Sequence, residues 1–353
     1  MPSLAHYDPT DLESLLRGWG YNPVHAKRLL RAFYDGCGII DADALPLPVA
    51  LRDRLRHDPV ACRSTVAAAR RASDGTTKLL VSLPDGAAVE AVLMPGFRPD
   101  RAAGCVSSQV GCAMGCDFCA STRGGLERNL EAGEIVEQFL HLKRAARELG
   151  RRLTSLVLMG MGEPMHNLDN VIPAIRRICD APTGALGWRQ VTVSTVGVVP
   201  GIDRITAADL NVNLALSLHA PDDATRARIV PSNRRYPVAE VMAATRRFAV
   251  ATGRIPTIEY CLLADVNDSD EHAAMLADLV SSDRFHVNLI PYNPIGAGVS
   301  GAVYKRPSDE RVSRFLGLLR DRGVVAHVRV TRGDDVDAAC GQLRETAARL
   351  SLV

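Results

Sequence analysis

Short apolar runs alternate with longer amphipathic stretches along the chain from about residue 104 onward. The apolar runs predict strands at 105–110, 155–159, 190–195, 213–218, 257–263, 286–290 and 326–330. The stretches between them carry apolar residues every three or four positions and predict helices at 132–149, 168–179, 238–252, 271–280 and 308–322. Strands that alternate with helices in this way usually pair in parallel, so the pattern predicts a barrel or a wound sheet.

The first 95 residues follow a different pattern. Asp8 is suited to cap a helix that begins at Pro9 and runs to about Gly18, and further helices are predicted at 23–34 and 49–56. Two apolar runs, 78–83 and 88–94, predict a hairpin, and residues 95–104 predict a linker. We therefore expect a small N-terminal α+β domain at 1–95 and a larger domain at 96–353.

Polar or glycine-rich patches follow nearly every predicted strand. They are Gly111–Cys119, Gly160–Pro164, Ser194–Thr195, Ser217–Ala220, Pro291–Pro294 and Thr331–Asp335. A (βα) barrel collects its active site at the carboxyl ends of its strands, whereas a wound sheet concentrates it at one switch point. The spread of the patches favours an α/β fold with an incomplete (βα) TIM-like barrel, because six or seven strands are predicted instead of eight.

Three cysteines on the loop after the first of these strands form a C-x3-C-x2-C pattern: Cys112, Cys116 and Cys119. Each iron of a four-iron cluster takes one thiolate, so three cysteines could hold three irons and leave the fourth open to a small molecule. A structural zinc site prefers four protein ligands, and Cys105 could supply the fourth. The spacing alone favours the cluster and leaves zinc open.

Composition limits the other possibilities. The chain has 353 residues, 47% of them hydrophobic and 23% charged, as in ordinary globular proteins. A net charge of +2 gives no overall field that would indicate a nucleic-acid partner. The nine cysteines show no paired framework, and neither a signal sequence nor an apolar run of about 20 residues is present. We expect a cytoplasmic protein with no membrane segment.

Single residues at strand ends are weaker signals. Glu163 follows the Gly160-Met161-Gly162 turn and could accept a hydrogen bond from a ligand ammonium. Ser194, Ser217, His219 and Asn293 also lie at strand ends, where capping or turn roles are equally open. Cys340 has small neighbours, which suits either a reactive thiol or a small buried apolar residue.

Several ordered motifs together resemble one family. They are Cys105–Cys112, the cysteine loop, Gly124–Leu130, Met159–Pro164, Ser217–Ala220 and Arg332–Leu343. From about residue 9 to 349, the chain resembles the RlmN/Cfr family of radical S-adenosylmethionine (SAM) RNA methyltransferases. This resemblance implies a barrel of the radical SAM type, with a [4Fe-4S] cluster on Cys112, Cys116 and Cys119. Cofactor contacts are implied for Gly162, Glu163, Ser194, Ser217, Leu218, His219 and Asn293.

The resemblance also implies a mechanism. Cys340 would become S-methylated, and Cys105 would release the RNA adduct by forming a transient disulfide with Cys340. Glu90 would be the proton acceptor. The implied reaction is methylation at C2 of an adenosine in 23S rRNA, with tRNA as a further candidate substrate and a donor such as flavodoxin supplying electrons to a monomeric enzyme. The stretch Thr331–Asp335 resembles the C2 branch more than the branch that methylates C8.

Two alternatives remain at this point: C8 methylation of the same adenosine, and a zinc-stabilised RNA-binding protein. Local basic clusters could contact phosphates despite the near-neutral total charge. The N-terminal domain is the better candidate for RNA binding. The basic residues Arg144, Arg147, Arg151 and Arg152 are expected to form a solvated helix face.

Overall fold

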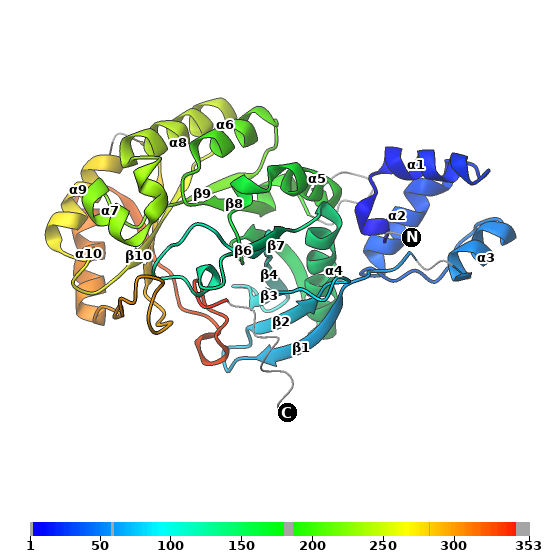
Figure 1. Ribbon diagram of the computed structural model, residues 1–353, viewed down its shortest axis with the longest axis horizontal. Helices are drawn as coiled ribbons and strands as arrows, with labels where there is room; N and C mark the ends of the chain where they lie inside the picture. Colours follow the sequence, from blue (N-terminus) through cyan, green and yellow to red (C-terminus); the bar gives the residue numbers. More distant parts are fainter. Residues whose placement is uncertain (1–2, 58–59, 180–185, 282, 344–353) are drawn as a thin grey trace.

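The computed structural model describes residues 3–57, 60–179, 186–281 and 283–343, which form one long curved sheet with helices outside it (Figure 1). The strands follow the order β1 (Thr65–Arg71), β2 (Thr77–Ser82), β3 (Ala88–Pro95), β4 (Arg101–Cys105), β7 (Arg152–Leu158), β8 (Val191–Thr195), β9 (Asn213–Ser217), β10 (Thr257–Leu262), β11 (His286–Pro291) and β12 (Val325–Val328). A separate pair consists of β5 (Gln109–Gly111) and β6 (Leu126–Asn129).

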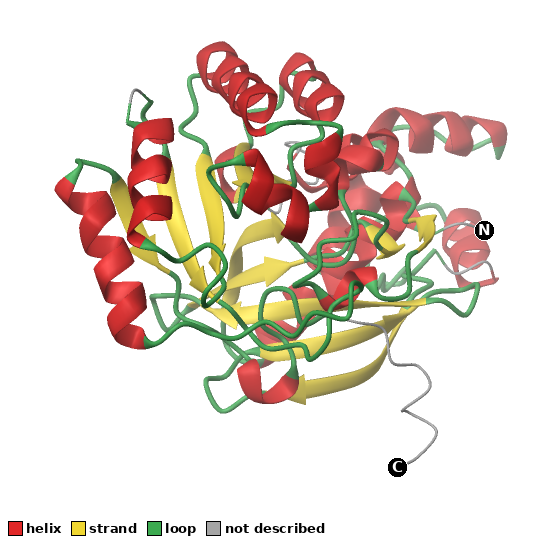
Figure 2. Cartoon of the chain, turned by 60° about the vertical axis from the view of Figure 1, so that its left-hand side comes forward, coloured by secondary structure: helices red, strands yellow, loops and turns green. Residues whose placement is uncertain are grey.

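Within the long sheet, β4, β7, β8, β9, β10, β11 and β12 pair in parallel with their neighbours in this order. This arrangement confirms the predicted incomplete barrel. Helices that connect them lie along the outer face of the sheet (Figure 2). The helices are α1 (Pro9–Gly18), α2 (His25–Asp35), α3 (Val49–His57), α4 (Ala132–Glu148), α5 (Leu168–Cys179), α6 (Val199–Ala207), α7 (Asp223–Ile229), α8 (Val238–Thr252), α9 (Asp270–Val280) and α10 (Asp309–Asp321). As predicted, Asp8 caps α1, with its Oδ1 accepting from the backbone of Asp11 at 2.8 Å. No helix in the described part of the chain is long and apolar enough to cross a bilayer.

The first barrel strand lies earlier than the sequence pattern predicted. It is β4, Arg101–Cys105, in the segment expected to be a linker, and the predicted strand 105–110 is replaced by a turn and β5. Strand β4 pairs antiparallel with β3 and parallel with β7. Strands β1–β3 therefore extend the barrel sheet, and the proposed domain boundary after residue 95 falls between two paired strands.

The expectation of a solvated basic face is wrong for Arg144, which is half-buried, whereas Arg147 and Arg152 are exposed as expected. Lys143, Arg144 and Arg147 donate to the backbone carbonyls of Tyr34, Cys37 and Asp35, at 2.7, 2.6 and 2.7 Å. These carbonyls belong to the C-terminal end of α2, where the helix lacks internal donors and its dipole favours cations. The basic residues of α4 thus attach the N-terminal helices to the barrel.

A buried carboxylate strengthens this attachment. Glu137 on α4 accepts hydrogen bonds from the Ser3 and Ser64 hydroxyls, both at 2.5 Å. It also accepts from the backbone N–H groups of Arg63 and Ser64 at 3.0 and 2.7 Å. One carboxylate therefore connects the beginning of the chain, the segment before β1 and the barrel.

The segment after β12 lies against the other end of the sheet, beside β1 and β2 (Figure 1). The Gly333 N–H donates to Asp74 Oδ2 at 3.2 Å, and the Ser73 N–H donates to Asp335 Oδ2 at 2.9 Å. Lys78 Nζ on β2 donates to the Asp337 carbonyl at 3.1 Å. The C-terminal segment 333–343 is therefore held across the open side of the incomplete barrel.

Candidate active site

The cysteine loop is shaped by short-range hydrogen bonds. Gly111 adopts φ +74°, and a Cβ at this position would meet the Gly125 carbonyl oxygen at 2.1 Å. The Thr122 hydroxyl lies 3.2 and 2.9 Å from the carbonyl oxygens of Cys116 and Cys119, to which it donates. A glycine is therefore required where the loop begins, and a hydroxyl closes the turn around the second and third cysteines.

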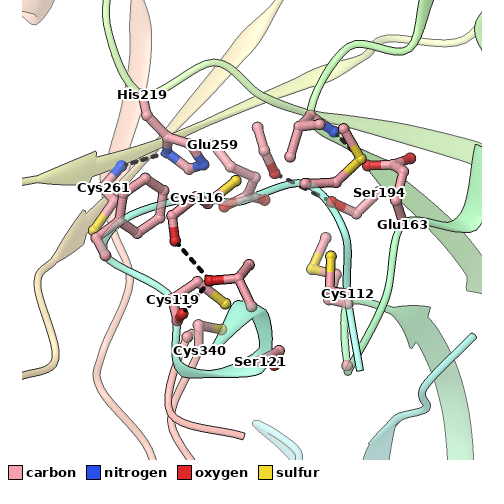
Figure 3. Close-up of a pocket in the computed structure, with 18 of the residues that line it drawn as sticks. Cys112, Cys116, Cys119, Ser121, Glu163, Ser194, His219, Glu259, Cys261 and Cys340 are labelled. Carbon is pink, nitrogen blue, oxygen red and sulfur yellow. Dashed lines mark hydrogen bonds between the residues drawn. The ribbon is translucent and has the colours of Figure 1, made fainter. Parts of the chain in front are cut away.

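All three loop cysteines line one cavity that is open to solvent and has about 940 Å³ of space free of protein atoms, part of it outside the protein surface (Figure 3). Burial raises the pKa of the Cys112 thiol to about 12 and that of Cys116 well above its usual value. Iron ligation requires thiolates, so binding a cluster would release these protons.

The spacing of the cysteine sulfurs decides whether a single zinc ion or a four-iron cluster fits the site better. Among the described residues, no three His, Cys, Asp or Glu side chains are arranged to hold a single metal ion. A zinc ion needs its four ligands within about 2.0–2.3 Å of one centre. A four-iron cluster binds each thiolate through a different iron atom and so accepts more widely spaced sulfurs. The three thiols on one cavity wall fit a cluster better than a zinc ion.

The turn after β7 brings Glu163 to the same cavity. Cβ atoms at Gly160 and Gly162 would meet Val106 and Gln109 at 2.8 and 2.6 Å, so both glycines allow close packing against the segment after β4. The Glu163 carboxylate accepts from the backbone N–H groups of Met165 and Val196 at 3.1 and 2.9 Å. Burial raises its pKa to about 7. Ionised Glu163 would gain from a cationic ligand group placed in the cavity.

Ser194, Ser217 and His219 also line this cavity, as predicted from their places at the ends of β8 and β9. The two serine hydroxyls lie 3.3 Å apart. His219 Nδ1 accepts from the Cys261 N–H at 3.0 Å, so the neutral ring carries its proton on Nε2. Burial lowers the pKa of His219 to about 3, and its ring packs edge-on against Phe118.

Four predicted residues, Leu218, Asn293, Glu90 and Cys105, are not among those lining the cysteine cavity. The Leu218 side chain is fully buried in the core. Asn293 lines the neighbouring cavity inside the barrel, and its Nδ2 donates to the Cys340 carbonyl at 3.2 Å. Glu90 is buried on β3 in an ion pair with Lys78, at 3.1 Å. Lys78 in turn contacts the segment that carries Cys340.

Cys340 is exposed and lines both cavities, so it is not a small buried apolar residue. The Ala120 N–H in the cysteine loop donates to the Gly341 carbonyl at 2.7 Å, which fixes Cys340 beside Cys119 (Figure 3). Cys105 is buried at the end of β4. Burial, and then the charge of Cys340, raises the pKa of Cys105 to about 12. Both thiols are free.

Three further residues of the cavity wall were not singled out as functional from the sequence. Glu259 and Arg329 lie on the wall shared by the two cavities, with Arg329 Nη1 3.5 Å from Glu259 Oε2. Negative charge on Cys340, and then on Glu259, holds the pKa of Arg329 above its usual value. Cys261 also lines the cysteine cavity. The positions of Cys261 and Arg329 near the ends of predicted strands were the available signal, whereas Glu259 lies inside its strand.

Comparison with known proteins agrees with this geometry. Residues 106–280 match the Radical SAM superfamily. The chain is 57% identical over 351 residues to "Probable dual-specificity RNA methyltransferase RlmN 1" of Opitutus terrae, covering 99% of each chain. It is 44% identical over 351 residues to "Probable dual-specificity RNA methyltransferase RlmN" of Chloroflexus aurantiacus, covering 96% of this chain and 92% of the relative.

Among solved structures, a radical SAM methyltransferase from Sphaerobacter thermophilus superposes with a TM-score of 0.91 at 45% identity. That match covers 98% of this chain and 99% of the other. The chain therefore belongs to the RlmN family of radical SAM RNA methyltransferases, which work with a [4Fe-4S] cluster and SAM.

Proposed function

We propose that the chain methylates C2 of an adenosine in the peptidyl-transferase region of 23S rRNA, through an S-methylcysteine on Cys340. A tRNA adenosine next to the anticodon is the proposed second substrate. The observation that carries this proposal is that Cys340 and the three loop cysteines line the same cavity. A methyl group on Cys340 would thus lie in the cavity that holds the cofactor.

In this proposal, Cys112, Cys116 and Cys119 bind the cluster. With SAM, the cluster would supply the radical chemistry that activates a methyl group. Glu163 would accept from the cofactor ammonium, and Ser194, Ser217, His219 and Gly162 would bind its remaining polar groups. The Leu218 side chain is buried, its N–H donates to the Glu259 carbonyl and its carbonyl accepts from Arg226, so its surroundings do not support a direct cofactor contact. Asn293 would act through the Cys340 segment.

The base chemistry needs two thiols. C2 of adenine has no acidic proton, so a radical on the methyl carbon of Cys340 would add to it. Glu90 is the proposed proton acceptor, supported by its buried carboxylate and by the Lys78 link to the Cys340 segment. Once the adduct has given one electron back to the bound cluster and its C2 proton to the acceptor, the Cys105 thiolate would attack the Cys340 sulfur. The disulfide would form as the bond from that sulfur to the methylene carbon breaks, and the carbon would leave on the base and take up a proton as the methyl group. The position of Cys105 near Cys340 supports this role.

The remaining parts of the proposal concern partners. A soluble electron donor such as flavodoxin would reduce the cluster, and the enzyme would act as a cytoplasmic monomer. The N-terminal region at 1–95 would help to present RNA. Exposed basic side chains of this region, such as Lys27 and Arg31, support that role because phosphate contacts need local positive charge.

Mass spectrometry of rRNA and tRNA nucleosides tests the reaction. A strain that lacks endogenous adenosine methylation, and that expresses this chain, should gain 2-methyladenosine at one rRNA position. A product methylated only at C8 would instead support the C8 alternative. Iron and sulfide analysis after anaerobic purification tests the site: a colourless protein with zinc and no iron would contradict the radical mechanism.

A further inference from the structure

A fully buried arginine lies behind the cysteine cavity. Arg226 on α7 is 0% exposed. Its guanidinium donates to the carbonyls of Leu218 and Val196 at 2.9 and 2.5 Å, and to Asn233 Oδ1 at 2.9 Å. A longer bond of 3.4 Å reaches the Tyr236 carbonyl. In the described part of the chain, all these acceptors are uncharged, and Arg226 forms no ion pair with a carboxylate.

The carboxylate nearest in sequence has other partners. Asp223 lies on the same helix, and its Oδ1 accepts from Asn233 Nδ2 at 3.0 Å and from the Val238 N–H at 2.8 Å. Burying a guanidinium without a neutralising partner is unfavourable, and its hydrogen bonds to carbonyls compensate only in part. Burial lowers the pKa of Arg226 to about 10, which still leaves the group charged at neutral pH. The site therefore contains one buried positive charge that forms no ion pair within the described residues, although the charge of Asp223 lies near enough to favour the protonated guanidinium.

The surroundings of Arg226 show where the matching negative charge would lie. Helix α7 ends against the cysteine loop, since the Asp117 N–H donates to the Ile229 carbonyl at 3.0 Å. Cys116 packs in the same apolar cluster as Ile229. Val196, whose carbonyl accepts from Arg226, lines the cysteine cavity. The guanidinium therefore lies near enough to Cys116 for the charges of the two residues to interact.

A cluster bound through three thiolates is anionic, and one-electron reduction by the external donor adds a further negative charge. Net charge and buried surroundings are among the factors that set the reduction potential of an iron–sulfur cluster. A fixed cation behind one ligand stabilises the reduced form more than the oxidised form, because the reduced form carries more negative charge.

We propose that Arg226 is the built-in counter-charge of the cluster and raises its reduction potential, so that the electron donor can reduce it. This inference rests on the proposed assignment of Cys112, Cys116 and Cys119 as cluster ligands. Arg226 does not line the cavity and would act on the cluster through Cys116. It is therefore a positioning residue that supplies a fixed charge, and not a catalytic residue.

The test compares Arg226→Met, Arg226→Lys and the matched control Arg228→Met in the anaerobically reconstituted full chain. Arg228 lies on the same helix but is exposed. Cluster reduction is followed by electron paramagnetic resonance during a potentiometric titration. In Arg226→Met we expect a reduced-to-oxidised ratio about tenfold lower at a given potential, which for one electron is a shift of about 59 mV. Arg228→Met should leave the ratio unchanged.

The lysine variant separates charge from hydrogen bonding. A buried lysine loses its proton more readily than arginine, so Arg226→Lys should match the wild type at low pH and approach Arg226→Met as pH rises. Potentials of Arg226→Met equal to wild type would overturn the inference. A reduction potential of Arg226→Lys that differs from that of the wild type by the same amount at every pH would also overturn the inference. This second measurement decides the question if Arg226→Met does not fold. Failure of the wild type to bind iron and sulfide would instead refute the ligand assignment.

Discussion

His219 should make the stability of the metal-free chain depend on pH in a measurable way. Its ring is 6% exposed, and Nδ1 accepts a backbone hydrogen bond, so protonation would require both burial of a charge and loss of that bond. Burial lowers the pKa of His219 from its model-peptide value of 6.5 to about 3. Because the folded-state pKa is lower than the unfolded one, the stabilisation is fully present above pH 6.5 and is lost as pH falls toward 3.

The size of this effect follows from linkage. Each pH unit below the unfolded pKa removes about 1.4 kcal/mol of unfolding free energy. Between pH 7.5 and 4.5, His219 alone should therefore account for a loss of about 2.7 kcal/mol. Other groups also titrate in this range, so the contribution must be isolated by comparison with a variant that lacks the imidazole.

His219→Asn is the suitable variant. His219 adopts φ +61°, and asparagine tolerates this left-handed conformation better than most residues. At pH 7.5 the variant should be less stable than wild type by about 1–2 kcal/mol, because it loses the contact with the Phe118 ring and leaves unfilled space. At pH 4.5 the order should reverse, since the variant has no buried imidazole to keep neutral.

Urea unfolding of the reduced, metal-free chains at several pH values measures the difference. His57→Asn, on the exposed end of α3, is the control and should follow the wild type at every pH. A stability difference between His219→Asn and wild type that stays constant from pH 7.5 to 4.5 would refute the reasoning. It would show that the imidazole accepts a proton in the folded chain as readily as in the unfolded one.

Three further predictions concern attachment, packing and chemistry. Glu137→Gln should lower the unfolding free energy, measured by urea unfolding, by about 2–4 kcal/mol, because the new amide group would point an N–H toward the backbone N–H groups of Ser64 and Arg63. The control Glu148→Gln, at an exposed position, should change the unfolding free energy little. Gly160→Ala should reduce thermal stability and bound iron, because its Cβ would meet Ser107 Oγ at 2.7 Å and the Val106 backbone at 2.8 Å; wild-type values in both assays would contradict this. Cys105→Ala should accumulate a covalent RNA–protein adduct on denaturing gels, whereas Cys340→Ala should form none and methylate no RNA; full activity of Cys340→Ala would end the mechanism.

The positions of the site residues could be predicted because they directly follow strands with a strong apolar pattern. β8 is rich in the β-branched residues Val and Thr, and β9 contains a Leu-Ala-Leu run, so their ends were predicted to within one residue. Parallel strands that alternate with helices place their carboxyl ends on one side. Ser194 and Ser217 therefore had to lie near one another, and their hydroxyls are 3.3 Å apart.

Strand β4 could not be predicted from its residues. Its sequence, Arg-Ala-Ala-Gly-Cys, contains no β-branched or aromatic residue, and alanine and glycine disfavour strands. The segment is extended because β3 and β7 pair with it on both sides. Tertiary pairing outweighs local preference here, so the apolar run after Cys105 gave the wrong location for the strand.

Arg226 and Arg228 illustrate a second limit. They lie two residues apart on α7, with the same side-chain chemistry, yet one is fully buried and the other is exposed. Which arginine points inward depends on how α7 meets the segments after β8 and β9, and those contacts join residues 8 to 30 positions apart. A short helix with several polar residues gives no periodic pattern from which this orientation could be predicted.

The placement of Cys340 depends on contacts that are still more distant in sequence. Asp74 and Asn293 hold the segment from two sides, and the Ala120 N–H binds the carbonyl of the next residue, Gly341. This last bond joins the segment of Cys340, the proposed methyl acceptor, directly to the loop of the proposed cluster ligands. Any shift of that loop would therefore move the Cys340 sulfur with it and preserve their relative position. Because the link bypasses the barrel strands, substitutions in the strand cores should alter stability before they alter the alignment between Cys340 and the loop cysteines.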